Sequence, residues 1–288
     1  MSTPKKQQHY VPKSLLNNFC EGTKKQLYAL FKDKREIAPV STNNIAKSSY
    51  LYNSMLDDDN LSALKRFFYL NQPLSQLVEN NKLTGTSLED WLEIFENRAI
   101  AIIRKINTAA DFKMNANEKQ LIILYTIGMK GRIKPTRDRI RSNAFAMSMD
   151  VGFADLIFPL LIASYFQTEF NPQDFLILVV RTESEAFCIS DAPALEQVNI
   201  RGISIGTFMP ISPLTAIGIT CNSDAIAKAS ETINLQDQGS ITINDKEVGR
   251  LNLLQVKNSN NGIFFMSQEQ AYSYLQIIQN SCDSSNYD

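Results

Sequence analysis

The chain contains a single histidine, His9, which stands near the N-terminus in the segment QHYVP. A Ser-His-Asp or Cys-His site would have to use His9 as its base, because the sequence offers no other imidazole. The alternative is a structural histidine that bonds a backbone carbonyl, while Tyr10 and Val11 anchor the N-terminal segment. Pro12 fits both interpretations, since it favours an extended Val11 and can open a following helix.

Two carboxylates could act together with this histidine. Glu96 lies on the shoulder of the apolar stripe of a helix predicted over 87–106, so its carboxylate points toward packed neighbours. Asp191 follows Ser190 at the end of the apolar strand AFCI, just before Pro193. Strand ends that present carboxylates and hydroxyls are frequent sites, although Ser-Asp before proline is equally typical of a turn.

A basic run, KGRIKPTRDRIR at residues 130–141, could bind an anion. Arg132 stands at the break before a proline, and Arg137 and Arg141 are four residues apart on one predicted helix face. Guanidinium groups bind phosphates and carboxylates through paired hydrogen bonds. The alternatives are direct nucleic-acid binding by the run, or a solvated helix face with one structural arginine paired with Glu96.

Metal and cofactor chemistry is restricted by the same composition. The sequence has no GxxxxGK[ST], GxGxxG, HExxH or GxSxG motif, and its four cysteines include no CxxC pair. There is therefore no signature for zinc, haem or a dinucleotide. A site made of carboxylates and at most one imidazole suits Mg²⁺ or Mn²⁺.

Composition predicts a folded, cytoplasmic protein. The chain is 44% hydrophobic and 20% charged with a net charge of −1, so any affinity for nucleic acid or acidic membranes must come from a local patch. The widely spaced cysteines favour a reducing compartment, and the N-terminal residues lack the apolar region of a secretory signal. The most apolar segment, 154–166, is short and contains Asp155 and Pro159, which favours a core helix over a membrane span.

The elements that must position these residues change along the chain. A hairpin is predicted over 25–42 with its tip at Lys32–Lys34, and Asn115 and Glu118 open a helix that ends near Gly131. Other helices are predicted at 56–71, 87–106, 136–149, 154–166, 247–258 and 268–279. Strands are predicted at 174–182 and 185–193, joined by the turn ESE, and at 206–212, 215–220, 239–244 and 262–267, with PISP as a rigid turn.

This order predicts an α+β fold, in which helices and strands are segregated along the chain. We expect one domain over 1–288 that is helix-rich at 1–170 and strand-rich at 171–288. In it, a helical N-terminal and central part packs on a mostly antiparallel sheet formed by the C-terminal half, with a short N-terminal hairpin.

Taken together, the motifs resemble a known family. QHYVP, the ExxA helix around Glu96, GRIKPTR, ISDAP, PISP and VGRLNLLQ before GIFFMS occur in the order seen in the domain of unknown function 4238 family, over nearly the full length. QHYVP is the most specific of them. Two motifs depart from the family pattern: Ile133-Lys134-Pro135 follows Arg132 where Thr-Pro is usual, and Ala192 stands where asparagine is usual.

The resemblance implies a convergent cluster of His9, Glu96, Arg132 or Arg137, and Asp191, but no particular activity. The leading hypothesis is a cytosolic hydrolase or nuclease-like enzyme that acts on nucleic acid or a nucleotide, in a defence or toxin role. In it His9 is the general base or acid, and Glu96 and Asp191 hold a divalent ion or orient His9. The residues that contact the substrate are Tyr10, Arg132, Arg137 and Ser190.

The alternative is a non-enzymatic binding or regulatory module with a protein partner. In that case the same polar residues form a buried network that attaches the N-terminal segment to the sheet. Neither hypothesis involves a membrane.

Overall fold

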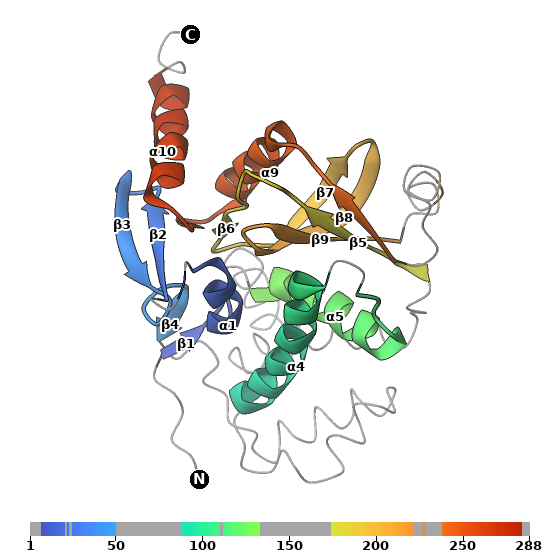
Figure 1. Ribbon diagram of the computed structural model, residues 1–288. Coiled ribbons are helices and arrows are strands. Elements are labelled where there is room, and N and C mark those ends of the chain that lie inside the picture. The colour runs from blue at the N-terminus through green and yellow to red at the C-terminus, as the bar shows by residue number, and fades with distance from the viewer. Residues whose placement is uncertain are drawn as a thin grey trace, which may run out of the picture. The chain divides into compact units, whose positions relative to one another are not determined.

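The computed structural model shows an α+β protein and describes residues 7–20, 22, 25–49, 88–109, 112–132, 174–221, 227 and 238–283 (Figure 1). The chain divides into two compact units. Unit 1 comprises Met1–Tyr10, Lys47–Lys105 and Met114–Asp174, and unit 2 comprises Val11–Ala46, Ile106–Lys113 and Phe175–Asp288. Residues 11–46 and 106–113 thus belong to the same unit as residues 175–288.

A five-stranded sheet forms much of unit 2. Its order is β10 (Gln238–Thr242), β5 (Leu176–Arg181), β9 (Thr215–Thr220), β8 (Ile203–Ser212) and β7 (Leu195–Ile200). Its pairings are antiparallel except that of β10 with β5, as expected for a mostly antiparallel sheet. The apolar runs of β5 and β9 are buried along nearly their whole length, which is typical of central strands.

A four-stranded antiparallel sheet, also in unit 2, joins the two ends of the sequence. Its order is β3 (Glu36–Ser41), β2 (Gln26–Phe31), β11 (Gly262–Phe265) and β6 (Ile189–Ser190). The predicted N-terminal hairpin is confirmed, and Arg35 in its turn has a φ of 51°. The predicted strands at 174–182 and 185–193 do not pair: β5 binds β9 and β10, whereas the shorter β6 binds β11.

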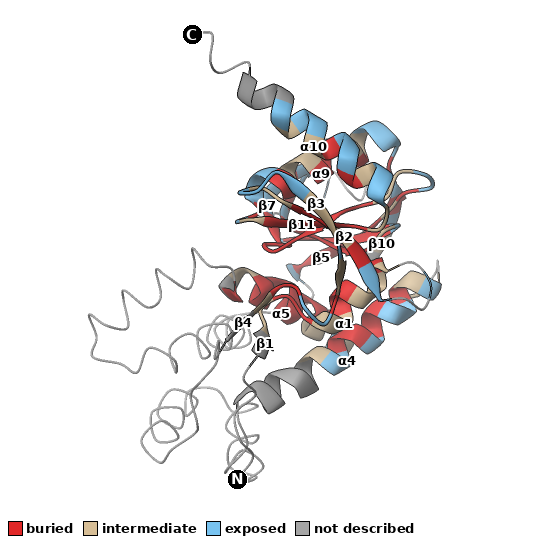
Figure 2. Cartoon of the chain, turned by 90° about the vertical axis from the view of Figure 1, so that its left-hand side faces the viewer, coloured by how far each residue is buried: buried red, intermediate tan, exposed pale blue. Residues whose placement is uncertain are grey.

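Helices pack on these strands within unit 2. The helix α9 (Asp245–Asn258) contacts β6 and β7, and α10 (Gln268–Asp283) contacts β2, β3 and β11. Figure 2 shows buried residues on the strands and exposed residues along the outer side of α10. One core cluster includes Leu30, Ile263, Phe265 and Tyr274, and the rings of Phe265 and Tyr274 stack at 5.4 Å.

The first residues of unit 2 form a short helix, α1 (Lys13–Leu16), followed by a 3₁₀ turn, η1 (Asn17–Phe19). Leu15, Leu16 and Phe19 are fully buried, as their helical spacing predicts. Only the last residue of the proline motif PISP, residues 210–213, lies in a turn. Pro210–Ser212 continue β8 with an irregular register, and the chain turns at the next two residues, Pro213 and Leu214.

Unit 1 contains a strand pair, most of one helix and the whole of another. The strand β1 (Gln7–His9) pairs with β4 (Lys47–Ser49), and the helices are α4 (Leu88–Thr108), whose last residues belong to unit 2, and α5 (Ala116–Arg132). The predicted start of α5 is confirmed as a capping box. The backbone N–H of Glu118 donates to Asn115 Oδ1 at 3.0 Å, and that of Asn115 donates to Glu118 Oε2 at 3.1 Å.

Three of the predicted helices, at 56–71, 136–149 and 154–166, lie outside the described residues, and Arg137 lies there with them. Among the helices that the structure does describe, none has the length and apolar character needed to cross a membrane.

Candidate functional site

An ion pair between two helices is the centre of the candidate site in unit 1. Arg132 Nη1, at the last residue of α5, donates to Glu96 Oε1 on α4 at 2.5 Å. The Arg132 side chain is 4% exposed and that of Glu96 is 18% exposed, so both charges are largely removed from water. One alternative drawn from the sequence was that an arginine of the basic run pairs with Glu96 as a structural contact, and Arg132 is that arginine.

Tyr125 belongs to the same environment. It is fully buried on α5, seven residues before Arg132, which places both residues on one helix face. Burial raises the pKa of the Tyr125 phenol far above its ordinary value; the negative charge of Glu96 raises it further, and Arg132 opposes this shift. The hydroxyl therefore stays protonated at neutral pH and can only donate or accept a hydrogen bond, without acting as a base.

His9 and Tyr10 lie at the end of β1, and both are half-buried. In the strand pair, His9 stands opposite Lys47 of β4. Both residues belong to unit 1, as Glu96 and Arg132 do. Unit 1 thus holds the histidine, one carboxylate and one guanidinium of the predicted cluster.

Asp191 lies in unit 2 and its carboxylate is occupied by backbone groups. Oδ1 accepts the N–H of Asn260 at 2.8 Å, and Oδ2 accepts those of Asn261 at 2.9 Å and Gly262 at 3.0 Å. Asp191 is 5% exposed. These contacts connect the end of β6 with the junction between α9 and β11.

Ser190 is also part of a buried network in unit 2. Its hydroxyl donates to Gln255 Oε1 on α9 at 2.6 Å and accepts the N–H of Ala192 at 3.2 Å. Gln255 Nε2 in turn donates to the carbonyl of Pro193 at 2.7 Å. Ser190 and Gln255 are fully buried, so ISDAP is held along α9 by side chains whose polar groups are satisfied within the protein.

Comparison with known proteins identifies the family. The family model described as "Protein of unknown function (DUF4238)" matches residues 7–150, half of the chain. The chain belongs to the DUF4238 family. No curated protein matches it, and no solved structure matches it.

The DUF4238 match separates the candidate residues. It contains His9, Tyr10, Glu96, Arg132 and Arg137. Ser190 and Asp191 lie beyond the end of the match, which spans only the first half of the chain. The candidates inside the match that the structure describes all belong to unit 1.

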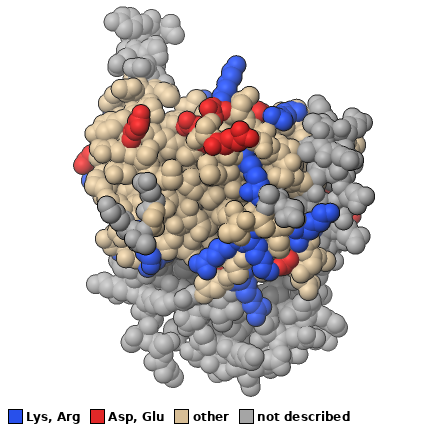
Figure 3. All heavy atoms as spheres, viewed as in Figure 1, with Lys and Arg blue, Asp and Glu red and all other residues tan. Residues whose placement is uncertain are grey.

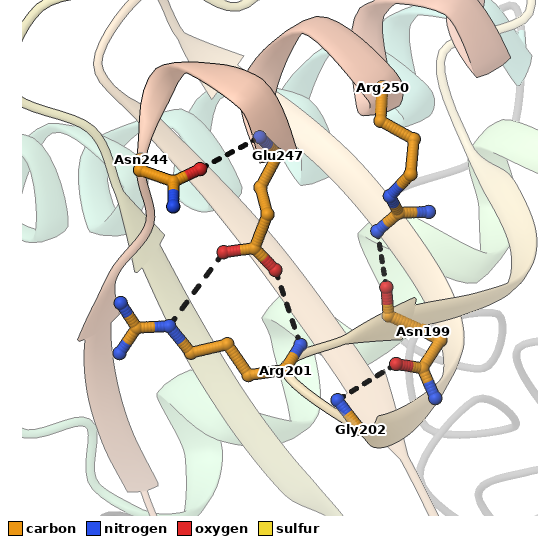
Figure 4. Close-up of polar contacts among 6 residues, drawn as sticks. All are labelled: Asn199, Arg201, Gly202, Asn244, Glu247 and Arg250. Carbon is orange, nitrogen blue, oxygen red and sulfur yellow. Dashed lines mark hydrogen bonds and ion pairs between the residues drawn. The ribbon is translucent and has the colours of Figure 1, made fainter.

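Unit 2 of the DUF4238 protein also has a polar cluster that no sequence motif indicated (Figure 4). Asn244 caps α9 by accepting the N–H of Glu247 at 3.0 Å, and Glu247 binds the backbone N–H and the side chain of Arg201 in the β7–β8 turn. Arg250 donates to the carbonyl of Asn199, which lies in β7 just before that turn. These contacts fix the start of α9 to the turn.

The charges at this end of unit 2 are mixed. Figure 3 shows acidic and basic side chains close together in the upper part of the view, where α9 lies. Opposite charges at short range cancel much of each other's field, so this surface is not a one-sign patch of the kind that attracts a polyanion.

Metal ligands were expected from the carboxylates. Within the described part of the chain, no group of three or more histidine, cysteine, aspartate or glutamate side chains is arranged to hold an ion. The expectation of Mg²⁺ or Mn²⁺ stays a prediction, as does the role of Arg137 in binding substrate.

Tyr125 is the residue that sequence reasoning missed in unit 1. Its spacing from Arg132 was visible as a helical repeat, but the apolar residues around it mark that face as core. Only the placement of Glu96 on the neighbouring helix makes the tyrosine relevant to the ion pair.

Proposed function

We propose that this DUF4238 protein is a hydrolytic enzyme that acts on a phosphate-containing substrate, a nucleic acid or a nucleotide, through unit 1. The observation that carries the proposal is the buried ion pair between Arg132 and Glu96. The proposal keeps the cytoplasmic location and the defence or toxin role expected from the sequence.

The physical reason is that a buried ion pair is a poor way to stabilise a fold. Removing two charges from water costs on the order of several kcal/mol for each ion. The attraction between the two ions often fails to offset this cost. An apolar pair of similar volume would serve packing between α4 and α5 as well or better. A guanidinium that a carboxylate holds in a dry site beside a neutral phenol has a fixed orientation, and low dielectric strengthens any further contact that it makes with an anion.

The proposal gives each side chain one role. Arg132 binds a phosphate oxygen, Glu96 orients the guanidinium, and Tyr10 contacts the substrate near the histidine. His9 accepts a proton from water as the water oxygen attacks phosphorus and the bond between phosphorus and the leaving oxygen breaks. The leaving oxygen takes up a proton from solvent. Arg137 supplies a second guanidinium to the phosphate.

Ser190 and Asp191 have no chemical role in this proposal, because their polar atoms are already used inside unit 2. The same observation favours a second candidate function, a non-enzymatic binding or regulatory module with a protein partner. In that case His9 also belongs to a structural network.

Turnover measurements on the purified full chain test the proposal. We would offer single-stranded DNA, single-stranded RNA, ATP and a chromogenic phosphomonoester, each with Mg²⁺, with Mn²⁺ and with a chelator. For the substrate that is hydrolysed, His9→Ala is expected to lower kcat about 10²- to 10⁴-fold, the usual contribution of a general acid or base. Arg132→Lys is expected to raise KM, because lysine keeps the charge but loses the planar fork.

Arg98→Ala is the matched control, since Arg98 is an exposed arginine on the same helix as Glu96. It should leave kcat and KM unchanged. Unchanged turnover in a folded His9→Ala protein would refute the role of His9. If none of the substrates is hydrolysed and His9→Ala only lowers the unfolding free energy, by about 1–3 kcal/mol, the binding module is favoured.

A further inference from the structure

The junction between α9 and β11 has the form of an anion-binding site. The N–H groups of three successive residues, Asn260, Asn261 and Gly262, point to one carboxylate, that of Asp191, at 2.8, 2.9 and 3.0 Å. Successive backbone N–H groups that converge in this way form a nest, a concave site of positive partial charge that binds anions. Asp191 also donates its own N–H to the carbonyl of Gly262 at 2.9 Å.

The burial of Asp191 makes these contacts necessary. Its side chain is nearly inaccessible, and a buried carboxylate is tolerated only when hydrogen bonds replace its lost hydration. The nest supplies three such bonds. Gly262 donates the third of them. Glycine suits this position because a Cβ would approach the Phe264 ring to 3.0 Å.

A lysine from the N-terminal hairpin supports the same junction. Lys32 Nζ donates to the carbonyls of Val256 at 3.0 Å and Ser259 at 2.8 Å, which lie at the end of α9. The ammonium group therefore compensates the negative end of the helix dipole at the segment that carries the nest.

The hairpin turn also binds the junction through its backbone. The N–H of Lys32 donates to the carbonyl of Asn261 at 2.9 Å, and that of Asp33 donates to Asn261 Oδ1 at 3.1 Å. Segments near residues 32, 191 and 260 thus meet at one short loop, where β11 begins between β2 and β6.

We propose that residues 260–262 form a carboxylate-binding nest and that Asp191 is its resident ligand, which positions β11 between β2 and β6. Asp191 acts through this loop and does not contact a substrate. The nest would accept a small free carboxylate, such as formate, if the side chain of Asp191 were removed. This inference concerns unit 2 and does not depend on the proposed hydrolytic function.

Chemical rescue tests the proposal. Asp191→Ala is expected to lower the Tm, and sodium formate is expected to restore about 2–4 °C of it in a saturable manner relative to sodium chloride at equal ionic strength. Two controls measure the general effect of each salt: the wild type, and Glu36→Ala, which removes an exposed carboxylate from β3. The Tm of each control should be the same in formate as in chloride. Equal Tm values of Asp191→Ala in formate and chloride would overturn the proposal.

Two further measurements cover an Asp191→Ala protein that does not fold. Refolding yield in formate should then exceed the yield in chloride at equal ionic strength, and equal yields would contradict the nest. In the wild type, the backbone amides of residues 260–262 should be protected from hydrogen exchange, although Asn260 is exposed. If these amides exchange as fast as those of an unstructured loop, the proposal is also overturned.

Discussion

At the scale of single residues, the candidate polar groups fall into two environments. Ser190 and Asp191 are buried and bonded to groups within unit 2, whereas His9 is half-buried at the end of a strand. The sequence identified these residues because of their types. As one alternative it predicted that an arginine of the basic run pairs with Glu96, and the structure shows that this arginine is Arg132. It could not predict which carboxylate is occupied, because the partners of Asp191 are some seventy positions away in the chain.

Removal of the Ser190 hydroxyl should destabilise the protein without any change in chemistry. Ser190→Ala leaves Gln255 Oε1 buried without its donor, and we expect the free energy of unfolding to fall by about 1–3 kcal/mol in urea titrations. Ser240→Ala, at an exposed serine of β10, should change it by less than about 0.5 kcal/mol. Equal effects of the two substitutions would contradict the network described for Ser190.

The cysteines should differ in reactivity. Burial raises the pKa of the Cys188 thiol far above its ordinary value, and burial also raises that of Cys20, with Lys25 opposing the shift. Cys221 is exposed. Peptide mapping after brief alkylation at pH 8 should therefore find Cys221 modified well before Cys188 in the folded protein. Comparable rates at the two cysteines would show that β6 opens on the timescale of the reaction.

At the scale of elements, local signals were sufficient where an element is defined by its own residues. The capping residues of α5, the hairpin β2–β3 and the helices α9 and α10 were all predicted from short-range patterns. PISP was predicted wrongly because two prolines favour a turn, yet Pro210 is accommodated at an irregularity in the register of β8. The strand β6 was predicted too long and with no indication of its partner, because only its pairing with β11 defines it.

The capping box of α5 gives a prediction on pH. Its Glu118 carboxylate is hydrogen-bonded by Lys105 Nζ at 2.8 Å, which lowers the pKa of Glu118, and the N–H of Asn115 lowers it further. A depressed carboxyl pKa stabilises the fold above the pKa of the unfolded chain, and this contribution is lost as pH falls through the folded-state pKa.

The free energy of unfolding of the wild type should therefore exceed that of Glu118→Gln at pH 7. The difference should be less than about 1 kcal/mol, because Lys105 is exposed, and it should disappear toward pH 3. Urea unfolding of both proteins at several pH values measures this. A difference that grows as the pH is lowered would contradict the assigned ion pair.

At the scale of the whole molecule, strand pairing across long sequence separations escaped prediction. β2 pairs with β11, more than 230 residues later, so the N-terminal hairpin and the C-terminal half build one sheet. The α+β fold and the mostly antiparallel pairing were predicted from the order of helices and strands along the chain. The order of the strands did not, since many pairings satisfy the same alternation of apolar and polar residues.

This topology predicts that residues 1–150, which include the family match, do not fold independently. Such a fragment lacks β11, which binds β2, and it lacks α10, which covers the hairpin. We expect β2 amides to exchange rapidly in the fragment and its thermal unfolding to lack the cooperative transition of the full chain. A cooperative transition with protected β2 amides would show that the N-terminal half is self-sufficient.

We propose hydrolytic chemistry for unit 1 and a structural role for Asp191 in unit 2. The most direct measurement compares turnover per folded molecule and Tm for His9→Ala and Asp191→Asn, on whichever phosphate substrate the wild type hydrolyses. We expect His9→Ala to lose about 10²- to 10⁴-fold in kcat while it remains folded, and Asp191→Asn to lower the Tm with kcat per folded molecule unchanged. Full turnover in folded His9→Ala, or loss of turnover in Asp191→Asn at an unchanged Tm, would contradict it.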